Sequence, residues 1–316
     1  MSLTSPPRHL LSLLDLSSAQ VQNLLTLAAQ TKSDFKKNGP NNLLQGKTSV
    51  LIFEKPSLRT RVTFEVALAH FGGTTINLQP TSISLGKRES VEDAAKNLGR
   101  WVDCIVARTF QHSLVEELAK YAQVPVINAL TDLFHPCQAL AFGLTAIEHQ
   151  GSLQGKNVVF VGDGNNVANC LAILCAHVGA NFTLCCPRGY EQPKFLQERL
   201  SSGLGQTGKN YSIQYNPEIA VQKADFIYTD VWVSMGEENI GEQKGKDFIG
   251  YQVNSSLLKK APAHCQVSHC LPAHRGEEIT SEVMDSHQSI CFDEAENRLH
   301  VQKAVLLALL HPTYTL

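Results

Sequence analysis

Short apolar or β-branched runs alternate with helical patterns along almost the whole chain. Such runs predict buried strands, because a strand covered on both faces is apolar at nearly every position. In the first half the predicted strands are Ser49–Phe53, Thr74–Leu78, Cys104–Ala107 and Val124–Ile127. In the second half they are Val158–Val161, Phe182–Cys186, Ser212–Tyr215, Phe226–Tyr228, Gln266–Ser268 and Ile290–Phe292.

Helices are predicted between most of these strands, the clearest being Val62–His70, Val91–Trp101, Ser113–Ala122, Ala139–His149 and Glu296–Leu310. Repeated strand–helix–strand units predict parallel sheets with helices on both faces. The chain of 316 residues is long enough for two of them. The expected fold class is therefore α/β, with two doubly wound domains, each a mainly parallel sheet flanked by helices. The polar, glycine-containing segment 150–156 divides them into residues 1–150 and 151–295.

Composition narrows the possible partners. Hydrophobic residues make up 43% of the chain and charged residues 18%, as in ordinary globular proteins. A net charge of −2 argues against a nucleic acid or an anionic membrane as partner, since either favours a basic surface. The nine cysteines are odd in number and form no Cys-x-x-Cys pair, which predicts free thiols in a reducing compartment. With no secretory or transit pattern at the N-terminus, we expect a cytoplasmic protein.

Polar residues follow several predicted strands at the point where each strand ends. In doubly wound folds, ligands bind beyond the carboxyl ends of the strands. The residues in such positions are Arg108, Asp132, His135, Gln138, Asn165, Asn166, Asp230, His269 and Cys270. Their shared placement is stronger evidence for a site than any one motif.

The segment Ser57-Leu58-Arg59-Thr60-Arg61 lies between a predicted strand and a predicted helix. Free backbone N–H groups and the positive end of the helix dipole favour an anion there. Arginine forks match phosphate oxygens in pairs. The segment therefore indicates a phosphate site. The alternative is an exposed basic helix start that pairs with neighbouring carboxylates.

His135-Pro136-Cys137-Gln138 opens a predicted helix, with proline in its first turn. His135 and Gln138 are three residues apart and share a face. Together they could donate hydrogen bonds to a carbonyl oxygen that gains negative charge during nucleophilic attack. The alternative is a histidine that only caps or packs locally.

Two motifs in the second half are weaker. Gly162-Asp163-Gly164-Asn165-Asn166-Val167 resembles the start of a dinucleotide fingerprint, but its last position is not Gly or Ala and no acidic residue ends the next strand. Two asparagines at a helix start suit a carboxylate equally well. The segment Asp230–Gly236 leaves a strand and leads into a polar, glycine-rich stretch, Glu237–Gly245, which is typical of a mobile lid. Asp230 could hold an ammonium. An ordinary surface loop is the alternative.

Histidines and cysteines gather near residue 270, as His264-Cys265, His269-Cys270 and His274. Their spacing fits no standard zinc pattern, and neighbours on a strand point to opposite faces. We therefore predict no metal, and we regard the Cys270 thiol as the better functional candidate.

Together these residues resemble the aspartate and ornithine carbamoyltransferase family. Ser57–Arg61 resembles the family's carbamoyl-phosphate signature, and His135–Gln138 its next signature. Ser234-Met235-Gly236 and His269-Cys270-Leu271-Pro272 are similar to the branch that acts on ornithine. The resemblance runs nearly end to end. It implies transfer of the carbamoyl group from carbamoyl phosphate to L-ornithine, giving L-citrulline and phosphate in arginine metabolism, most often in biosynthesis.

The resemblance also implies roles for individual residues. Those that bind carbamoyl phosphate are Ser57, Leu58, Arg59, Thr60, Arg108, His135, Gln138, Cys270, Leu271 and Arg298. Those that bind ornithine are Asn166, Asp230, Ser234 and Met235. Arg108, His135 and Cys270 are the implied catalytic residues. Arg298 lies in the last helix, so residues 296–316 are expected to pack back on the first domain.

The resemblance implies no metal and no organic cofactor, and a homo-oligomer, in this family a trimer. In the family, the loop corresponding to Ser82–Ser90 reaches the neighbouring subunit's site, and some relatives have Gln where this chain has Ser84. A relative that uses another amine and a non-catalytic carbamoyl-phosphate-binding paralogue remain as alternatives. A nicotinamide-dependent enzyme is a more distant one.

Overall fold

The structure is a computed structural model that describes residues 9–78, 85–86, 89–204, 210–233 and 238–314. Within these ranges no helix combines the length and apolarity needed to cross a bilayer. The chain divides into two compact units. The first contains residues 1–16, 23–137 and 298–316, and the second contains residues 17–22 and 138–297.

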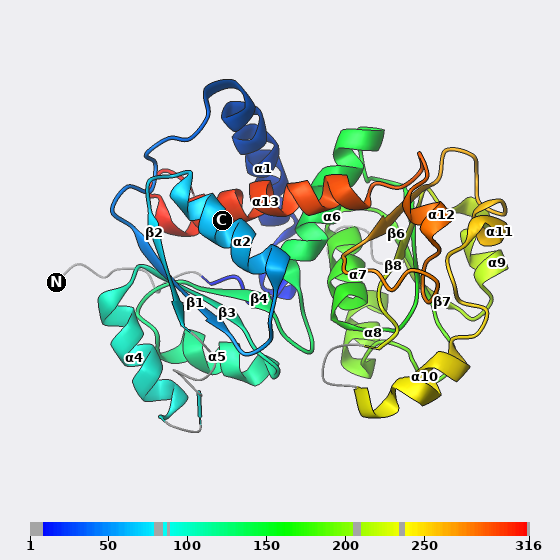
Figure 1. The fold of residues 1–316 in the computed structure, drawn as a ribbon, viewed down its shortest axis with the longest axis horizontal. Helices are drawn as coiled ribbons and strands as arrows, with labels where there is room; N and C mark the ends of the chain where they lie inside the picture. Colours follow the sequence, from blue (N-terminus) through cyan, green and yellow to red (C-terminus); the bar gives the residue numbers. More distant parts are fainter. Residues whose placement is uncertain (1–8, 79–84, 87–88, 205–209, 234–237, 315–316) are drawn as a thin grey trace. The chain divides into compact units, whose positions relative to one another are not determined.

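The first unit is built on a four-stranded parallel sheet in the order β2-β1-β3-β4. Its strands are β1 (Thr48–Phe53), β2 (Thr74–Leu78), β3 (Cys104–Arg108) and β4 (Val126–Leu130). Figure 1 shows α4 (Val91–Trp101) and α5 (His112–Tyr121) on one face of this sheet and α2 (Leu58–Ala69) on the other. Val50, Ile52 and Ala107 pack with Val115 and Leu118 in the core between strands and helices.

The second unit is built on a five-stranded parallel sheet in the order β7-β6-β5-β8-β9. Its strands are β5 (Asn157–Val161), β6 (Asn181–Cys185), β7 (Tyr211–Gln214), β8 (Phe226–Thr229) and β9 (Gln266–His269). Its helices are α7 (Asn166–Val178), α8 (Lys194–Ser201), α9 (Pro217–Ala220), α10 (Gly241–Asp247), α11 (Ser255–Leu258) and α12 (Ser281–Met284).

Alternate residues of β8 show how the two faces are covered. Ile227 belongs to a cluster with residues of α11 and α12. On the other face, the rings of Phe226 and Tyr228 contact Phe142 of α6 (Pro136–Gln150) at centroid distances of 5.5 and 5.3 Å. A strand buried in this way needs apolar residues at successive positions, which is why its sequence lacks polar alternation.

Three helices contribute residues to both units: α1 (Ser18–Asn38), α6 and α13 (Cys291–Leu310). The predicted fold class is confirmed, and the end of the chain from Arg298 onward groups with the first unit as expected. The helix α1 has no counterpart among the predicted elements.

The predicted strand Ile290–Phe292 is wrong. Ser289 forms a single bridge with Val267, and α13 begins at Cys291, five residues before the predicted start of the last helix. Ile290 is buried whereas Phe292 is 63% exposed. Three apolar residues in a row predicted a buried strand, but Phe292 is an apolar residue on the exposed surface of α13.

Candidate active site

The first unit turns Ser57–Arg61 into a helix start. Ser57 is the N-cap of α2, and its Oγ accepts a hydrogen bond of 3.3 Å from the backbone N–H of Thr60. Leu58 begins the helix and is 74% exposed, whereas Thr60 is buried. Backbone N–H groups at such a start, together with the helix dipole, favour an anion.

Three arginines from distant parts of the chain gather around one histidine in this unit. Arg298 of α13 is buried, and its Nη2 donates a hydrogen bond of 3.0 Å to Thr60 Oγ1. Arg108 is the buried last residue of β3. Burial, followed by the charges of Arg298, Arg108 and Arg59, holds the pKa of His135 well below its usual 6.5. The histidine is therefore a neutral hydrogen-bonding group within a strongly positive environment.

The depressed pKa of His135 should destabilise the protein in acid. The unfolded chain binds a proton on this residue near pH ~6.5, whereas the folded chain does so only at lower pH. The free energy of unfolding should therefore fall as the pH drops below ~6.5, and less steeply in His135→Gln. Urea unfolding at several pH values measures this, with the exposed His264→Gln as control. A pKa near 6.5 for His135 in the folded protein, measured by NMR titration, would contradict the prediction.

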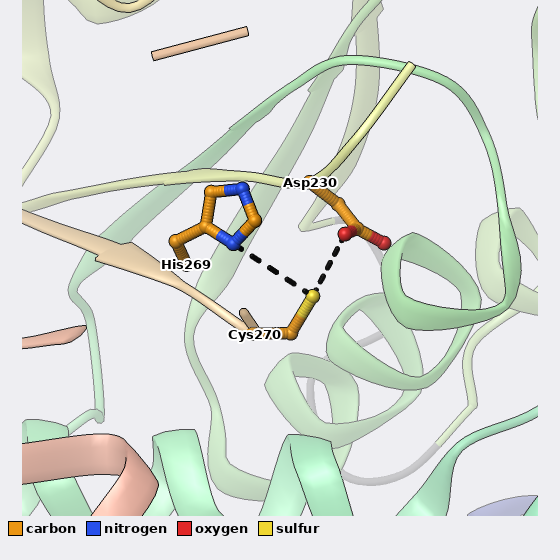
Figure 2. Close-up of side chains that lie close together, drawn as sticks. All are labelled: Asp230, His269 and Cys270. Carbon is orange, nitrogen blue, oxygen red and sulfur yellow. Dashed lines mark hydrogen bonds between the residues drawn. The ribbon is translucent and has the colours of Figure 1, made fainter. Parts of the chain in front are cut away.

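The second unit brings a carboxylate and a thiol together at the ends of β8 and β9. Asp230 follows β8 and is 8% exposed. Its Oδ1 accepts hydrogen bonds of 2.8 Å from Cys270 Sγ and from the Val231 N–H, and its Oδ2 accepts one of 2.8 Å from Asn165 Nδ2. Figure 2 shows the Cys270 thiol between the Asp230 carboxylate and the His269 ring. The cluster can bind an amine through acceptors and assist its loss of a proton.

A buried pair, His269 and Glu278, supports this cluster. His269 Nδ1 accepts a hydrogen bond of 2.8 Å from the Leu271 N–H, so the ring hydrogen lies on Nε2. Nε2 then donates to Glu278 Oε1 at 3.0 Å, and both side chains are fully buried. Leu271 has a φ of 58°, in the left-handed region that non-glycine residues seldom adopt. The pair therefore holds the backbone that presents Cys270 and the Leu271 carbonyl.

Asp230, His269 and Cys270 also have the donor types that a metal ion could use, since their ligand atoms lie within 4.8 Å of one another. All three side chains already form hydrogen bonds within the protein. A metal ion there would have to displace the Leu271 N–H and the thiol proton. The other histidine of the predicted motif, His264, pairs instead with Asp225 at 3.0 Å. The absence of a metal requirement stays a prediction.

Comparison with known proteins places this pair of sites in a family. Residues 8–148 match the family model described as the carbamoyl-P binding domain of aspartate/ornithine carbamoyltransferase, and residues 154–309 match its Asp/Orn binding domain. The chain belongs to the aspartate/ornithine carbamoyltransferase family. It is 47% identical over 303 residues to the ornithine carbamoyltransferase of Pyrococcus horikoshii, with 96% of each chain covered.

Two further carbamoyltransferase relatives come from Pyrococcus furiosus. A protein named ornithine carbamoyltransferase, anabolic, is 47% identical over 299 residues, covering 95% of each chain. The solved structure of an ornithine carbamoyltransferase from that organism matches with a TM-score of 0.94 at 46% identity, covering 97% of this chain and 98% of that one. The likeness therefore extends over both units.

The remaining predicted residues of this carbamoyltransferase have varied surroundings. Arg61 fits the alternative drawn from sequence, because it is 47% exposed and its Nε donates to Glu65 at 2.9 Å. Asp132 accepts a hydrogen bond of 2.8 Å from the His112 N–H at the start of α5. Asn166 is the first residue of α7, next to the N-cap Asn165. Ser234 and Met235, together with Ser84, lie outside the described residues.

The sequence of this carbamoyltransferase did not predict any role for Glu294, whose carboxylate is buried beside a predicted site residue. It accepts hydrogen bonds from Gln138 Nε2, Tyr228 Oη and Ser268 Oγ, at 2.5, 2.7 and 2.5 Å. Glu294 thus fixes the predicted site residue Gln138. Glu278 and Asn165 were likewise not singled out as supports. Nothing in the local pattern marks these residues, because their partners lie on other elements.

We expect Cys270 to be the first cysteine of this carbamoyltransferase to react with iodoacetamide. It is half-buried, whereas the other eight are buried. Burial also raises the pKa of Cys265 and of Cys291 to about 12, which keeps these thiols protonated and unreactive. Peptide mass spectrometry over a time course measures the order of labelling. Faster labelling of a buried cysteine in the folded protein would contradict the expectation.

Proposed function

We propose that this chain is an ornithine carbamoyltransferase, which transfers the carbamoyl group of carbamoyl phosphate to the δ-amine of L-ornithine. The δ-nitrogen bonds to the carbamoyl carbon, the bond from that carbon to the phosphate oxygen breaks, and the nitrogen loses a proton. The products are L-citrulline and phosphate. The observation that supports ornithine as acceptor is the hydrogen-bonded pair of Cys270 and Asp230, since the cysteine distinguishes the ornithine branch of the family from the aspartate branch.

The domain of residues 1–150, with residues 296–316, takes carbamoyl phosphate in this proposal. The helix start at Ser57 and Leu58, with Arg59, Thr60 and Arg108, binds the phosphate, and Arg298 adds a further charge. Neutral His135 and Gln138 donate hydrogen bonds to the carbamoyl oxygen. Preorganised donors and cations of this kind stabilise the charge that develops on the carbamoyl oxygen and on the leaving phosphate.

The domain of residues 151–295 takes ornithine. Asn166 at the start of α7 binds the carboxylate and Asp230 binds the α-ammonium. Ser234 and Met235 complete the ornithine site. The δ-amine resembles that of lysine, with a pKa near ~10.4, so it arrives protonated and must lose a proton before it attacks. Cys270 and the Leu271 carbonyl bind the neutral amine and assist this loss.

An acceptor panel tests the proposal. Carbamoylated product is measured with ornithine, putrescine, N-acetylornithine and aspartate, each at several concentrations with saturating carbamoyl phosphate. We expect kcat/KM to be highest for ornithine. A preference for another amine would identify a different carbamoyltransferase, and no turnover together with retained carbamoyl-phosphate binding would identify a non-catalytic paralogue.

The proposed setting is cytoplasmic arginine biosynthesis by a homotrimer. The anabolic relative from Pyrococcus furiosus supports the biosynthetic direction. Light scattering coupled to size-exclusion chromatography tests the assembly, because a trimer has three times the chain mass of 34.7 kDa. A monomer at working concentration would remove this part of the proposal without affecting the acceptor.

A further inference from the structure

A buried ion pair lies close in sequence to residues of the proposed ornithine site. Lys244 of α10 donates from Nζ to Asp163 Oδ2 at 2.6 Å, with side-chain exposures of 3% and 14%. A buried ion pair contributes little net stability, because removing two charges from water offsets most of their attraction. Its position in the fold therefore calls for another explanation.

Asp163 belongs to the glycine-rich turn between β5 and α7, the motif that resembled a dinucleotide fingerprint. The backbone N–H of Gly164 donates to the Tyr190 carbonyl at 2.9 Å. A Cβ on Gly164 would lie only 2.5 Å from the backbone N of Gln192, so no other residue fits. The glycine is explained by close packing of the turn against residues 190–192. The Asp163 side chain is held separately, by Lys244.

The short helix α10 is itself anchored. Tyr190 Oη donates to Asp247 Oδ2 at 2.7 Å, and Lys244 Nζ lies 5.8 Å from the centre of the Tyr190 ring. Phe248, directly after α10, is fully buried and stacks on Trp232 at 5.6 Å between ring centroids. Trp232 lies two residues after Asp230, so the ring contact ties the end of α10 to the strand end that presents Asp230.

A continuous set of contacts leads from Lys244 to the Cys270 thiol. Asp163 pairs with Lys244, and its carbonyl accepts a hydrogen bond of 2.7 Å from the Asn165 N–H. Asn165 Nδ2 donates to Asp230 Oδ2, and Asp230 Oδ1 accepts from Cys270 Sγ. Asn165 also caps α7 by accepting from the N–H groups of residues 167 and 168.

We propose that Lys244 is a positioning residue for the amino acid acceptor. Its ion pair with Asp163 holds the turn so that Asn165 orients the Asp230 carboxylate toward the α-ammonium and Asn166 is positioned for the carboxylate. Lys244 itself touches no substrate. The inference rests on the proposed function, because it assigns Lys244 to the ornithine half of that reaction.

The main test compares Lys244→Met with Lys244→Arg. Methionine preserves length and packing without the charge, whereas arginine restores the charge. We expect Lys244→Met to raise the KM for ornithine by about 10- to 100-fold, as small misplacements of a binding group do. The KM for carbamoyl phosphate should stay within a factor of about two, and Lys244→Arg should recover most of the ornithine affinity.

Controls separate positioning from stability. Lys246→Met removes an exposed lysine of the same helix, paired with Glu242 at 2.8 Å, and should leave both KM values unchanged. The double variant Lys244→Met/Asp163→Asn leaves no buried charge without a partner, so it serves if the single variant fails to fold. It should show the same raised KM for ornithine as the single variant, because the two side chains act as one unit.

Two results would overturn the inference. A lower melting temperature with unchanged KM for ornithine in Lys244→Met would show a merely structural pair. Equal increases in KM for both substrates would show no link to the acceptor. If the acceptor panel identifies another amine for the wild-type protein, the proposed function fails separately, and the same variants measured with that amine still test the role of Lys244.

Discussion

Replacing Arg59 with alanine is expected to lower kcat by more than about 100-fold, which makes it one of the two largest effects we predict. Arg59 lies close enough to lower the pKa of His135, together with Arg108 and Arg298. Removing one preorganised cation from a site where charge develops usually costs this much. Steady-state kinetics at saturating carbamoyl phosphate and ornithine measure the loss. Arg59→Lys should recover only part of it, because an ammonium cannot reproduce the two-pronged contact of a guanidinium.

Arg61→Ala is the matched control, two residues away on the same helix. The Arg61 side chain is 47% exposed and pairs with Glu65, so its loss removes a surface ion pair worth little. Turnover should stay near the wild-type value. Similar losses in the two variants would show that the segment acts through its overall charge, and near-normal turnover in Arg59→Ala would refute the role proposed for Arg59.

Replacing Asp230 with asparagine is expected to lower kcat/KM for ornithine by about 100-fold or more. The change removes the negative charge proposed to bind the α-ammonium and weakens the acceptor of the Cys270 thiol proton. A hydrogen bond to a charged group contributes about 1.5–3 kcal/mol, which corresponds to roughly 10- to 100-fold for each contact. The KM for carbamoyl phosphate should change little, so the kinetics must be measured for each substrate separately.

Asp225→Asn provides the control at the opposite end of the same strand. Asp225 precedes β8 and accepts hydrogen bonds from the Asn157 N–H at 2.8 Å and from His264 at 3.0 Å. Its loss should lower the urea midpoint of unfolding and leave the KM for ornithine unchanged. An Asp230→Asn variant that behaves like Asp225→Asn would remove Asp230 from the acceptor site.

Most of the regular structure was predictable because burial leaves a local pattern. Eight of the predicted strands overlap strands of the structure closely, and Val124–Ile127 overlaps β4 with a shift toward Leu130. The errors arise where the pattern is ambiguous. At Ile290–Phe292, three apolar residues in a row suit a buried strand and a helix start alike. At α2, the polar residues 59–61 concealed the first turn, and the helix begins at Leu58 after the Ser57 cap, four residues earlier than predicted.

For the candidate site the sequence predicted which residues belong to it, and both this membership and the assigned roles stay predictions. Sequence motifs and family resemblance identified Arg59, His135, Asp230 and Cys270, but not the residues that hold them. The sequence indicates Asn165 as a ligand for a carboxylate or a dinucleotide, whereas its side chain donates a hydrogen bond to Asp230. Glu278 belongs to no recognised motif, and Lys244 lies in the stretch that the sequence predicts only as a mobile lid. Each of these three residues acts through a hydrogen bond or ion pair, and the partner in that contact is distant in the sequence.

The sequence alone was sufficient to establish the alternation of strands and helices, the two parallel sheets and the family, because each depends on patterns among neighbouring residues. It did not establish that Arg298 bonds Thr60 across 238 residues, that Cys270 bonds Asp230, or that Lys244 pairs with Asp163. Those contacts depend on the order and register of the strands and on the course of the chain between them. A buried charge is stable only beside its partner, so these pairings become visible only once the chain is folded.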